Sequence, residues 1–123
     1  MNFWAIESSF LKMITILKMI QKKKIEGYWY SEYSKEYPMP IKDELTDFES
    51  LKISELIEIK ENESQLIRYR GFSHSRITGE MLGSTEFEHP DGWAWPCDFR
   101  THYVLKFKVK PTDEFLTWIG WKT

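Results

Sequence analysis

The segment STEFEHPDGWAW, from Ser84 to Trp95, constrains the fold more than any other part of the chain. Its centre, HPDG at positions 89–92, has proline at the second position of a four-residue turn and Asp-Gly after it, a composition that β-turns favour. The flanking residues include aromatic and β-branched side chains that suit strands. The segment therefore predicts an antiparallel hairpin in which residues 84–89 pair with residues 93–95.

A further strand is expected upstream of this hairpin. The sequence QLIRYRGF at residues 65–72 alternates in the manner of a strand and places Arg68 and Arg70 on the same face. Gly79 and Gly83 mark turns between this segment and the hairpin. Together these segments predict a small antiparallel sheet of three or four short strands.

A middle helix is expected directly before this sheet. Thr46 or Asp47 can cap it, and apolar residues continue at helical spacing to about Lys60. The polar sequence ENES then separates the helix from the first strand.

Two short helices are expected after the sheet. Asp98 can cap a helix over about residues 99–107. Thr112 has the position of an N-cap for a last helix within residues 110–121, and Gly120 has the position of its stop.

The N-terminus has the pattern of an amphipathic helix over residues 5–24. Its apolar side chains recur at intervals of three and four residues: Ile6, Phe10, Met13, Leu17 and Ile20. Lys12 and Lys18 interrupt this apolar run, which leaves it too short to span a bilayer. A helix on a membrane surface is one interpretation. The broad apolar face favours a helix that packs on its own domain or joins two copies of the chain.

An extended arm is expected over residues 27–45. Its aromatic stretch Tyr28–Ile41 contains Pro38 and Pro40, which exclude a regular helix. Such a stretch lies across a domain surface and is held there by its rings. A proline-rich docking ligand is the alternative, although P-M-P lacks the P-x-x-P spacing of that class.

The length of 123 residues suits a single domain. We expect an α+β fold over residues 1–123, with an N-terminal helix extension (1–26), the arm (27–45) and a core (46–121). The single cysteine excludes an internal disulfide, and no signal-peptide cleavage pattern follows the first apolar run, so we expect a cytoplasmic protein.

Charge is spread unevenly along the chain, although the net charge is only −2. Residues 1–24 carry five lysines and one acid, residues 41–64 carry eight acids and three lysines, and residues 100–123 carry five basic side chains and two acids. No overall basic field favours nucleic acid. The acidic middle is either a solvated face or a surface for a basic partner.

Motifs for catalysis are missing from the sequence. There is no G-x-S-x-G, no phosphate-binding G-x-x-x-x-G-K-[ST] and no G-x-G-x-x-G. Cys97 and His102 would point in different directions on a helix, and Glu86 and Glu88 share one strand face as surface charges would. The sequence therefore favours a non-catalytic protein over an enzyme.

Metal ligation is also not expected from spacing. The candidate zinc ligands are His74, His89, Cys97 and His102. None of them forms the close Cys or His pairs that structural zinc sites use. We therefore expect no cofactor.

From Ser50 onward the chain resembles a family of small, functionally uncharacterised bacterial proteins. The residues that carry the resemblance are YRGFSHSRITG (69–79), LGSTEF (82–87), WAWPCDFRTHYVLKFKV (93–109) and KPTDEF (110–115). The family pattern runs Y-x-G-x-S-x-C-R-I-C-G, N-G-S-x-E, W-x-W-P-x-G-L-x-H-Y-V-x-x-H-x-V and L-P-x-E-F. Its two cysteines and two histidines have the composition of a zinc-finger-like Cys₂His₂ site.

The resemblance implies a degenerate zinc site in this chain. Ser75 and Thr78 stand where the family has its cysteines, and Phe107 stands in place of the second histidine. Only His102 remains, and one ligand does not make a zinc site. We expect a metal-free corner in which Phe107 fills space and His102 forms a hydrogen bond.

These observations favour a small non-catalytic interaction protein, such as an inhibitor or an immunity-type binder of another protein. The alternative is a nucleic-acid-binding or regulatory module derived from a zinc-finger-like domain, although nucleic acid is the less favoured partner. The expected partner surface consists of acidic, aromatic and basic side chains: Asp43, Glu44, Asp47, Glu49, Glu55, Glu58, Tyr28, Trp29, Tyr30, Arg68 and Arg70. Salt should weaken binding to a basic partner.

Overall fold

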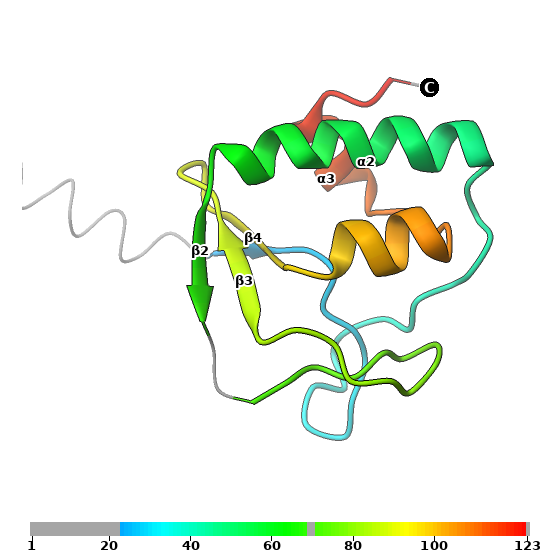
Figure 1. Ribbon diagram of the computed structural model, residues 1–123, viewed down its shortest axis with the longest axis vertical. Helices are drawn as coiled ribbons and strands as arrows, with labels where there is room; N and C mark the ends of the chain where they lie inside the picture. The colour runs from blue at the N-terminus through cyan, green and yellow to red at the C-terminus, as the bar shows by residue number, and fades with distance from the viewer. Residues whose placement is uncertain (1–22, 69–70, 123) are drawn as a thin grey trace, which may run out of the picture.

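The computed structural model of the protein describes residues 23–68 and 71–122 (Figure 1). The helix expected over residues 5–24 lies outside the described residues except at its end. There the expectation is wrong, because Lys24 belongs to a short strand, β1 (Lys24–Ile25). Two residues are too few to show the alternation of a strand. The neighbouring lysines also suit the last turn of a helix, so the sequence did not separate the two structures.

The sheet has four strands in the order β1-β4-β3-β2. Strands β2 (Gln65–Arg68), β3 (Thr85–Glu88) and β4 (Trp93–Pro96) are antiparallel, as expected. Strand β1 runs parallel to β4, so the sheet is mixed and the expectation of a purely antiparallel sheet is wrong. Two backbone hydrogen bonds hold the parallel strand. The amide of Lys24 donates to the carbonyl of Gly92, and the amide of Glu26 donates to the carbonyl of Ala94.

The hairpin expected at HPDG is confirmed. The amide of Gly92 donates to the carbonyl of His89 over 2.9 Å and closes the turn. Gly92 has a φ of 96°, a left-handed value that glycine adopts without strain. The register places Phe87 opposite Trp95, so both rings lie on one face of the sheet.

The middle helix, α2 (Asp47–Asn62), begins where the sequence predicts. The hydroxyl of Thr46 accepts the amide of Glu49, and the Glu49 carboxylate accepts the amide of Thr46, which together form a capping box. The core-facing side of the helix carries Ile53 and Ile57, both fully buried.

The two C-terminal helices are also present, but the first is of another type. It is a π-helix, η1 (Phe99–Lys106), in which the amide of Phe107 donates to the carbonyl of His102 five residues back. The wider turn places Phe99 and Val104, five residues apart, together in the core. The period of 3.6 residues expected for an α-helix does not predict this spacing.

The last helix, α3 (Asp113–Ile119), has the expected ends. Thr112 is its N-cap, and its hydroxyl accepts the amide of Phe115. Gly120 follows the last turn with a φ of 89°, the left-handed conformation that ends many helices.

Aromatic rings from the sheet and α3 form the centre of the core. Trp93 and Trp95 of β4 lie 5.2 and 5.8 Å from the ring of Phe115, and Trp118 stacks on Trp93 at 5.6 Å. Helix α2 lies alongside η1, drawn in orange beneath it in Figure 1, and packs against both C-terminal helices. The result is an α+β fold with a mixed sheet of four strands and three helices in the described part of the chain.

No helix within residues 23–68 and 71–122 is long and apolar enough to cross a membrane.

Candidate functional site

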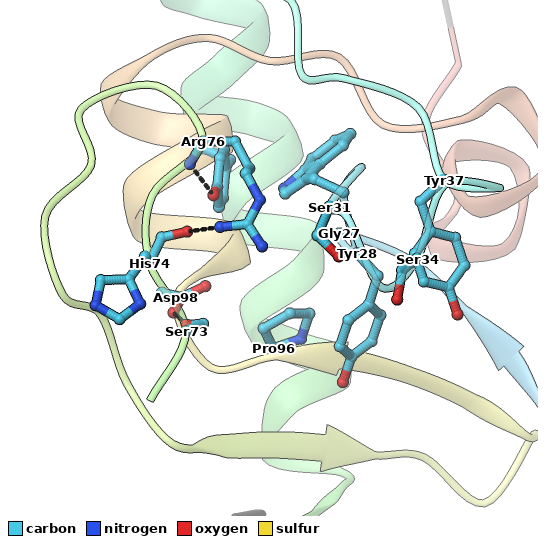
Figure 2. A pocket seen from close by; sticks show the side chains of 12 residues that line it. Gly27, Tyr28, Ser31, Ser34, Tyr37, Ser73, His74, Arg76, Pro96 and Asp98 are labelled. Atoms are coloured by element: carbon cyan, nitrogen blue, oxygen red, sulfur yellow. Dashed lines mark hydrogen bonds between the residues drawn. The ribbon is translucent and has the colours of Figure 1, made fainter. Parts of the chain in front are cut away.

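A cavity of about 150 Å³ lies between the arm and the loop that follows β2. The arm contributes residues 27–37, and the loop contributes Ser73, His74 and Arg76. Figure 2 shows these two segments facing each other, with Pro96 and Asp98 at the base. We call this space the arm cavity.

Arg76 joins the two walls of the arm cavity. Its Nε donates to the carbonyl of Tyr30 in the arm over 2.9 Å. Its Nη1 donates to the carbonyl of His74 over 2.8 Å (Figure 2). Its own amide donates to the hydroxyl of Tyr103 in η1. These contacts fix the plane of the guanidinium across the cavity.

Asp98 places a buried carboxyl group at the base of the cavity. Its Oδ2 accepts the hydroxyl of Ser73 over 3.0 Å and the amide of Gly83 over 3.3 Å. Burial raises the pKa of the Asp98 carboxyl, and the two hydrogen bonds act in the opposite direction. Asp98 therefore ties the loop to the start of η1.

Trp29 forms an aromatic wall of the cavity. Its ring lies 5.2 Å from that of Tyr103 and 6.4 Å from that of Phe99. Trp29 belongs to the expected partner surface. Its ring is partly buried against the core, and its part in a partner surface stays a prediction. Its Nε1–H is buried and has no hydrogen-bond acceptor among the described residues.

A second cavity, of about 270 Å³, lies on the other side of the arm and contains Glu26. The Glu26 carboxylate accepts the amide of Thr112 over 2.6 Å and its hydroxyl over 3.0 Å. Burial raises the pKa of Glu26 to about 7, while the Thr112 hydrogen bonds lower it. Glu26 thus links the arm to the start of α3.

Glu26→Gln is expected to remove part of the pH dependence of stability. Folding raises the pKa of Glu26 from 4.5 to about 7, so the protonated carboxyl contributes to the free energy of unfolding. This contribution is complete below pH 4.5 and is lost as the pH rises through 7. The loss is at most about 3 kcal/mol. We expect the variant to match the wild type at pH 4.5 and to be the more stable protein at pH 8, as measured by urea unfolding. A difference that is the same at both pH values would contradict this assignment.

The four positions of the expected degenerate zinc site come together in one corner. His102 Nε2 lies 2.7 Å from Ser75 Oγ, and the His102 ring lies 5.0 Å from that of Phe107. The amide of Thr78 donates to Ser75 Oγ over 3.0 Å. The five-residue turn of η1 is what places His102 beside Phe107.

This corner lacks the donor set for zinc. The Ser75 hydroxyl is already engaged by His102 and by backbone amides, and Phe107 offers only carbon. No three His, Cys, Asp or Glu side chains gather in a ligand-like cluster anywhere in residues 23–68 and 71–122.

The Ser75–His102 contact has the hydrogen-bond direction of a catalytic serine–histidine pair, but it is buried within the fold. Ser75 Oγ accepts the amides of Ile77 and Thr78, so its own hydrogen goes to His102 Nε2. Burial lowers the pKa of His102, which favours the neutral imidazole that this bond needs. Glu80 lies 3.7 Å from His102 Nδ1, but Ser75 is only 4% exposed and offers no approach to a substrate.

Ser75→Ala is expected to destabilise the fold by about 2 kcal/mol. The change removes one hydroxyl and leaves the Nε2 of buried His102 and two backbone amides without their partner. Urea unfolding at pH 7 measures the loss. Ser84→Ala, a serine-to-alanine change at a half-buried position, is the control and should cost less. Equal losses for the two variants would show that the corner does not depend on Ser75.

The acidic residues expected to form a partner surface have separate roles. Asp47 pairs with Lys108 over 2.5 Å, and Glu49 caps α2. Glu55 lies 3.5 Å from Lys52, and Glu58 lies 3.9 Å from Arg100 of η1. Asp43 and Glu44 instead lie in the segment before α2, where their amides donate to the carbonyls of Phe107 and Lys108.

The remaining expected surface residues divide between the arm and the sheet. The hydroxyl of Tyr28 donates to Glu86, so this ring is tied to β3. Tyr30 is exposed, and Arg68 is exposed on the edge strand β2. Arg70 lies outside the described residues. The expected surface residues that the structure describes therefore lie on α2, in the segment before it, in the arm and on β2, and one shared surface stays a prediction.

The outer face of α2 is a feature that the sequence analysis missed. Phe48, Leu51 and Ile59 are 65%, 49% and 54% exposed. The apolar residues of this helix were predicted only by their helical spacing, without a division between a core side and an outer side. The signal was present, since α2 has more apolar residues than one buried stripe needs.

Comparisons with models of known families, with curated proteins and with solved structures found no match for this chain.

Proposed function

We propose that this chain is a small non-catalytic interaction protein that binds another protein through the outer face of α2, as an inhibitor or immunity-type protein would. The observation that carries the proposal is the row of exposed apolar side chains on that face. Phe48, Leu51 and Ile59 are spaced so that they share one side of the helix with Glu55. This side is opposite to the one that packs on η1 and α3.

The charge of this face indicates the chemistry of the partner. Glu55 lies among the apolar side chains, 3.5 Å from Lys52, and Glu58 lies at the border of the face, 3.9 Å from Arg100 of η1. An apolar strip with a carboxylate border fits a partner surface with apolar anchors and a basic rim. Association with such a partner should be fast and sensitive to salt.

Ser75 and His102 are the side chains that come nearest to a catalytic pair. Both have structural roles, which supports a non-catalytic protein. Ser75 and His102 hold each other in a buried corner. The nucleic-acid alternative has less support, because Arg76 and Arg100 are bonded within the fold, to backbone carbonyls and to Glu61. Pairing of two copies through residues 5–24 stays a prediction outside the described residues.

The test compares two sets of exposed apolar residues. Leu51→Asp with Ile59→Asp changes the outer face of α2, and Met39→Asp with Met81→Asp changes exposed methionines elsewhere. Each purified protein is used as bait in lysate of the source cells, after its unfolding curve shows that it is folded. We expect one stoichiometric partner on the wild type and on the methionine variant, and none on the α2 variant. Raising the salt from about 0.05 to 0.5 M should release it.

Two results would overturn the proposal. One is a partner that the α2 variant retains at the wild-type level. The other is the absence of any stoichiometric partner on the wild type.

A further inference from the structure

We propose that the second cavity binds a small organic cation, a primary ammonium carried on an apolar group, with the Glu26 carboxylate as its acceptor. We call this space the Glu26 cavity. It lies between the arm and the start of α3 and is separate from the outer face of α2. The two proposals therefore stand or fall independently.

Glu26 supplies a buried carboxylate that can accept further hydrogen bonds. It lines the cavity and is only 6% exposed. Its Oε2 accepts the amide of Thr112, and its Oε1 accepts the Thr112 hydroxyl. A carboxylate has about four lone-pair sites, so each oxygen can accept one more hydrogen bond. A primary ammonium, with three N–H donors, can use both of them.

The charge of Glu26 has no counter-ion within the described residues. Both of its hydrogen-bond donors belong to Thr112 and are neutral. The charged group that acts on it is Glu114, a second carboxylate, and Lys24 pairs with Glu114 over 3.2 Å. Buried charges in proteins are almost always paired, so a cation beside Glu26 would complete this arrangement.

The other charged residues of the cavity lining do not supply this cation. Glu44 adds a second carboxylate, and no basic side chain in residues 23–68 and 71–122 forms an ion pair with it. Lys110 is the basic residue of the lining, but its Nζ lies 3.8 Å from the carboxylate of Asp113, outside the lining. Lys110 is also not among the groups that act on Glu26. Two carboxylates against one lysine leave the lining with an excess of negative charge.

The walls of the Glu26 cavity select the apolar part of the ligand. The volume of about 270 Å³ exceeds the volume of about 150 Å³ that holds a benzene ring. The rings of Tyr28 and Tyr37 lie 6.3 Å apart in the lining, and ring faces attract cations. Met39 and Ile41 also line the cavity and are 53% and 61% exposed, so the cavity reaches the surface there. An aromatic or alkyl tail would cover these side chains.

Binding of a cation should depend on pH, because it requires the ionised form of Glu26. Burial raises the pKa of Glu26 to about 7, so the carboxylate is the main form at pH 8 and the neutral acid is the main form at pH 6. An alkylammonium group stays charged over this whole range. The affinity should therefore fall about tenfold from pH 8 to pH 6.

The test follows the backbone amide of Thr112 in the full-length ¹⁵N-labelled protein by NMR, because this amide donates to Glu26. Benzylamine, in its ammonium form, is the cation probe, and benzyl alcohol is the neutral probe of nearly the same shape. We expect benzylamine at pH 8 to shift the Thr112 signal in a saturable manner, with a dissociation constant on the order of 1 mM. Benzyl alcohol should bind about tenfold more weakly or less, with no change between pH 8 and pH 6.

Matched variants separate the site from general charge effects. Glu26→Gln keeps the shape of the side chain and removes its charge, so it should weaken benzylamine binding at pH 8 about tenfold or more. This variant is expected to be more stable than the wild type at that pH, so a loss of binding does not arise from unfolding. Glu114→Gln makes the same charge change outside the cavity lining and should alter the affinity by less than about twofold.

Three outcomes would overturn the proposal. The first is the absence of a saturable shift of the Thr112 signal with benzylamine at pH 8. The second is a benzyl alcohol affinity equal to that of benzylamine, which would show that the cavity selects only the ring. The third is equal benzylamine affinity in the wild type and in Glu26→Gln, which would place the ammonium away from this carboxylate.

Discussion

Gly27→Ala is expected to destabilise the protein by about 2 to 5 kcal/mol. Two effects contribute, and both arise from the Cβ atom that alanine adds. Gly27 has a φ of 76°, where an L-residue other than glycine costs about 1–2 kcal/mol. A Cβ at this position would also lie 2.5 Å from Cδ1 and 2.7 Å from Cγ of Phe99. Phe99 is fully buried at the start of η1, so it cannot move aside without disturbing the core, which adds about 1–3 kcal/mol.

Gly79→Ala is the matched control for this prediction. Gly79 has a φ of 79°, but nothing lies within 4 Å of a Cβ built there. Its substitution should therefore show the backbone cost alone. Urea unfolding of the two variants and the wild type measures the difference, which reports the contact with Phe99. If Gly27→Ala costs no more than Gly79→Ala, the arm does not approach η1 as closely as the structure shows.

Local sequence signals predicted the parts of the fold that local chemistry determines. The HPDG turn, the capping box at Thr46 and the stop at Gly120 each depend on a few adjacent residues. The pairing of β1 with β4 depends instead on residues almost seventy positions apart. No pattern in two residues such as Lys24 and Ile25 can indicate such a partner.

The same distinction applies to the candidate sites. The resemblance singled out Ser75 and His102, and these side chains do meet in the fold. The arm cavity was missed, because Arg76 and Trp29 come from two irregular segments without a period that could relate them. The packing of Trp29 against the core could not be predicted for a related reason. Aromatic residues in a proline-containing arm suit exposure and burial equally well until the path of the arm is known.

One contact connects the arm to both of its cavities. The arm passes Phe99 at Gly27 with no room for a side chain, and the next residues line the cavities on either side. Trp29 lines both of them and packs on Phe99. A larger residue at position 27 should therefore disturb both cavities as well as the core.

Trp95→Ala is expected to cost about 3–5 kcal/mol, the range for removing a large aromatic side chain from a core. Trp95 is fully buried, with its ring 5.8 Å from Phe87, 5.8 Å from Phe115 and 5.9 Å from Trp118. Its removal would leave a cavity bordered by rings from the sheet and from α3. Small domains have a total stability of about 5–15 kcal/mol, so the variant should be close to unfolding at room temperature.

Two further variants divide this loss into its causes. Trp95→Phe keeps most of the ring but removes the Nε1–H that donates to the buried carboxylate of Glu61 over 3.4 Å, so it should cost about 1–2 kcal/mol. Trp121→Ala removes a half-buried indole at the border of the same cluster and should cost less than Trp95→Ala. Urea unfolding followed by far-ultraviolet circular dichroism measures all three variants without relying on tryptophan fluorescence. A Trp121→Ala loss equal to that of Trp95→Ala would place the centre of the core elsewhere. If Trp95→Ala is the more destabilised variant, as expected, the centre of the core lies where strand β4 meets α3. This agrees with the burial of β4 along its whole length.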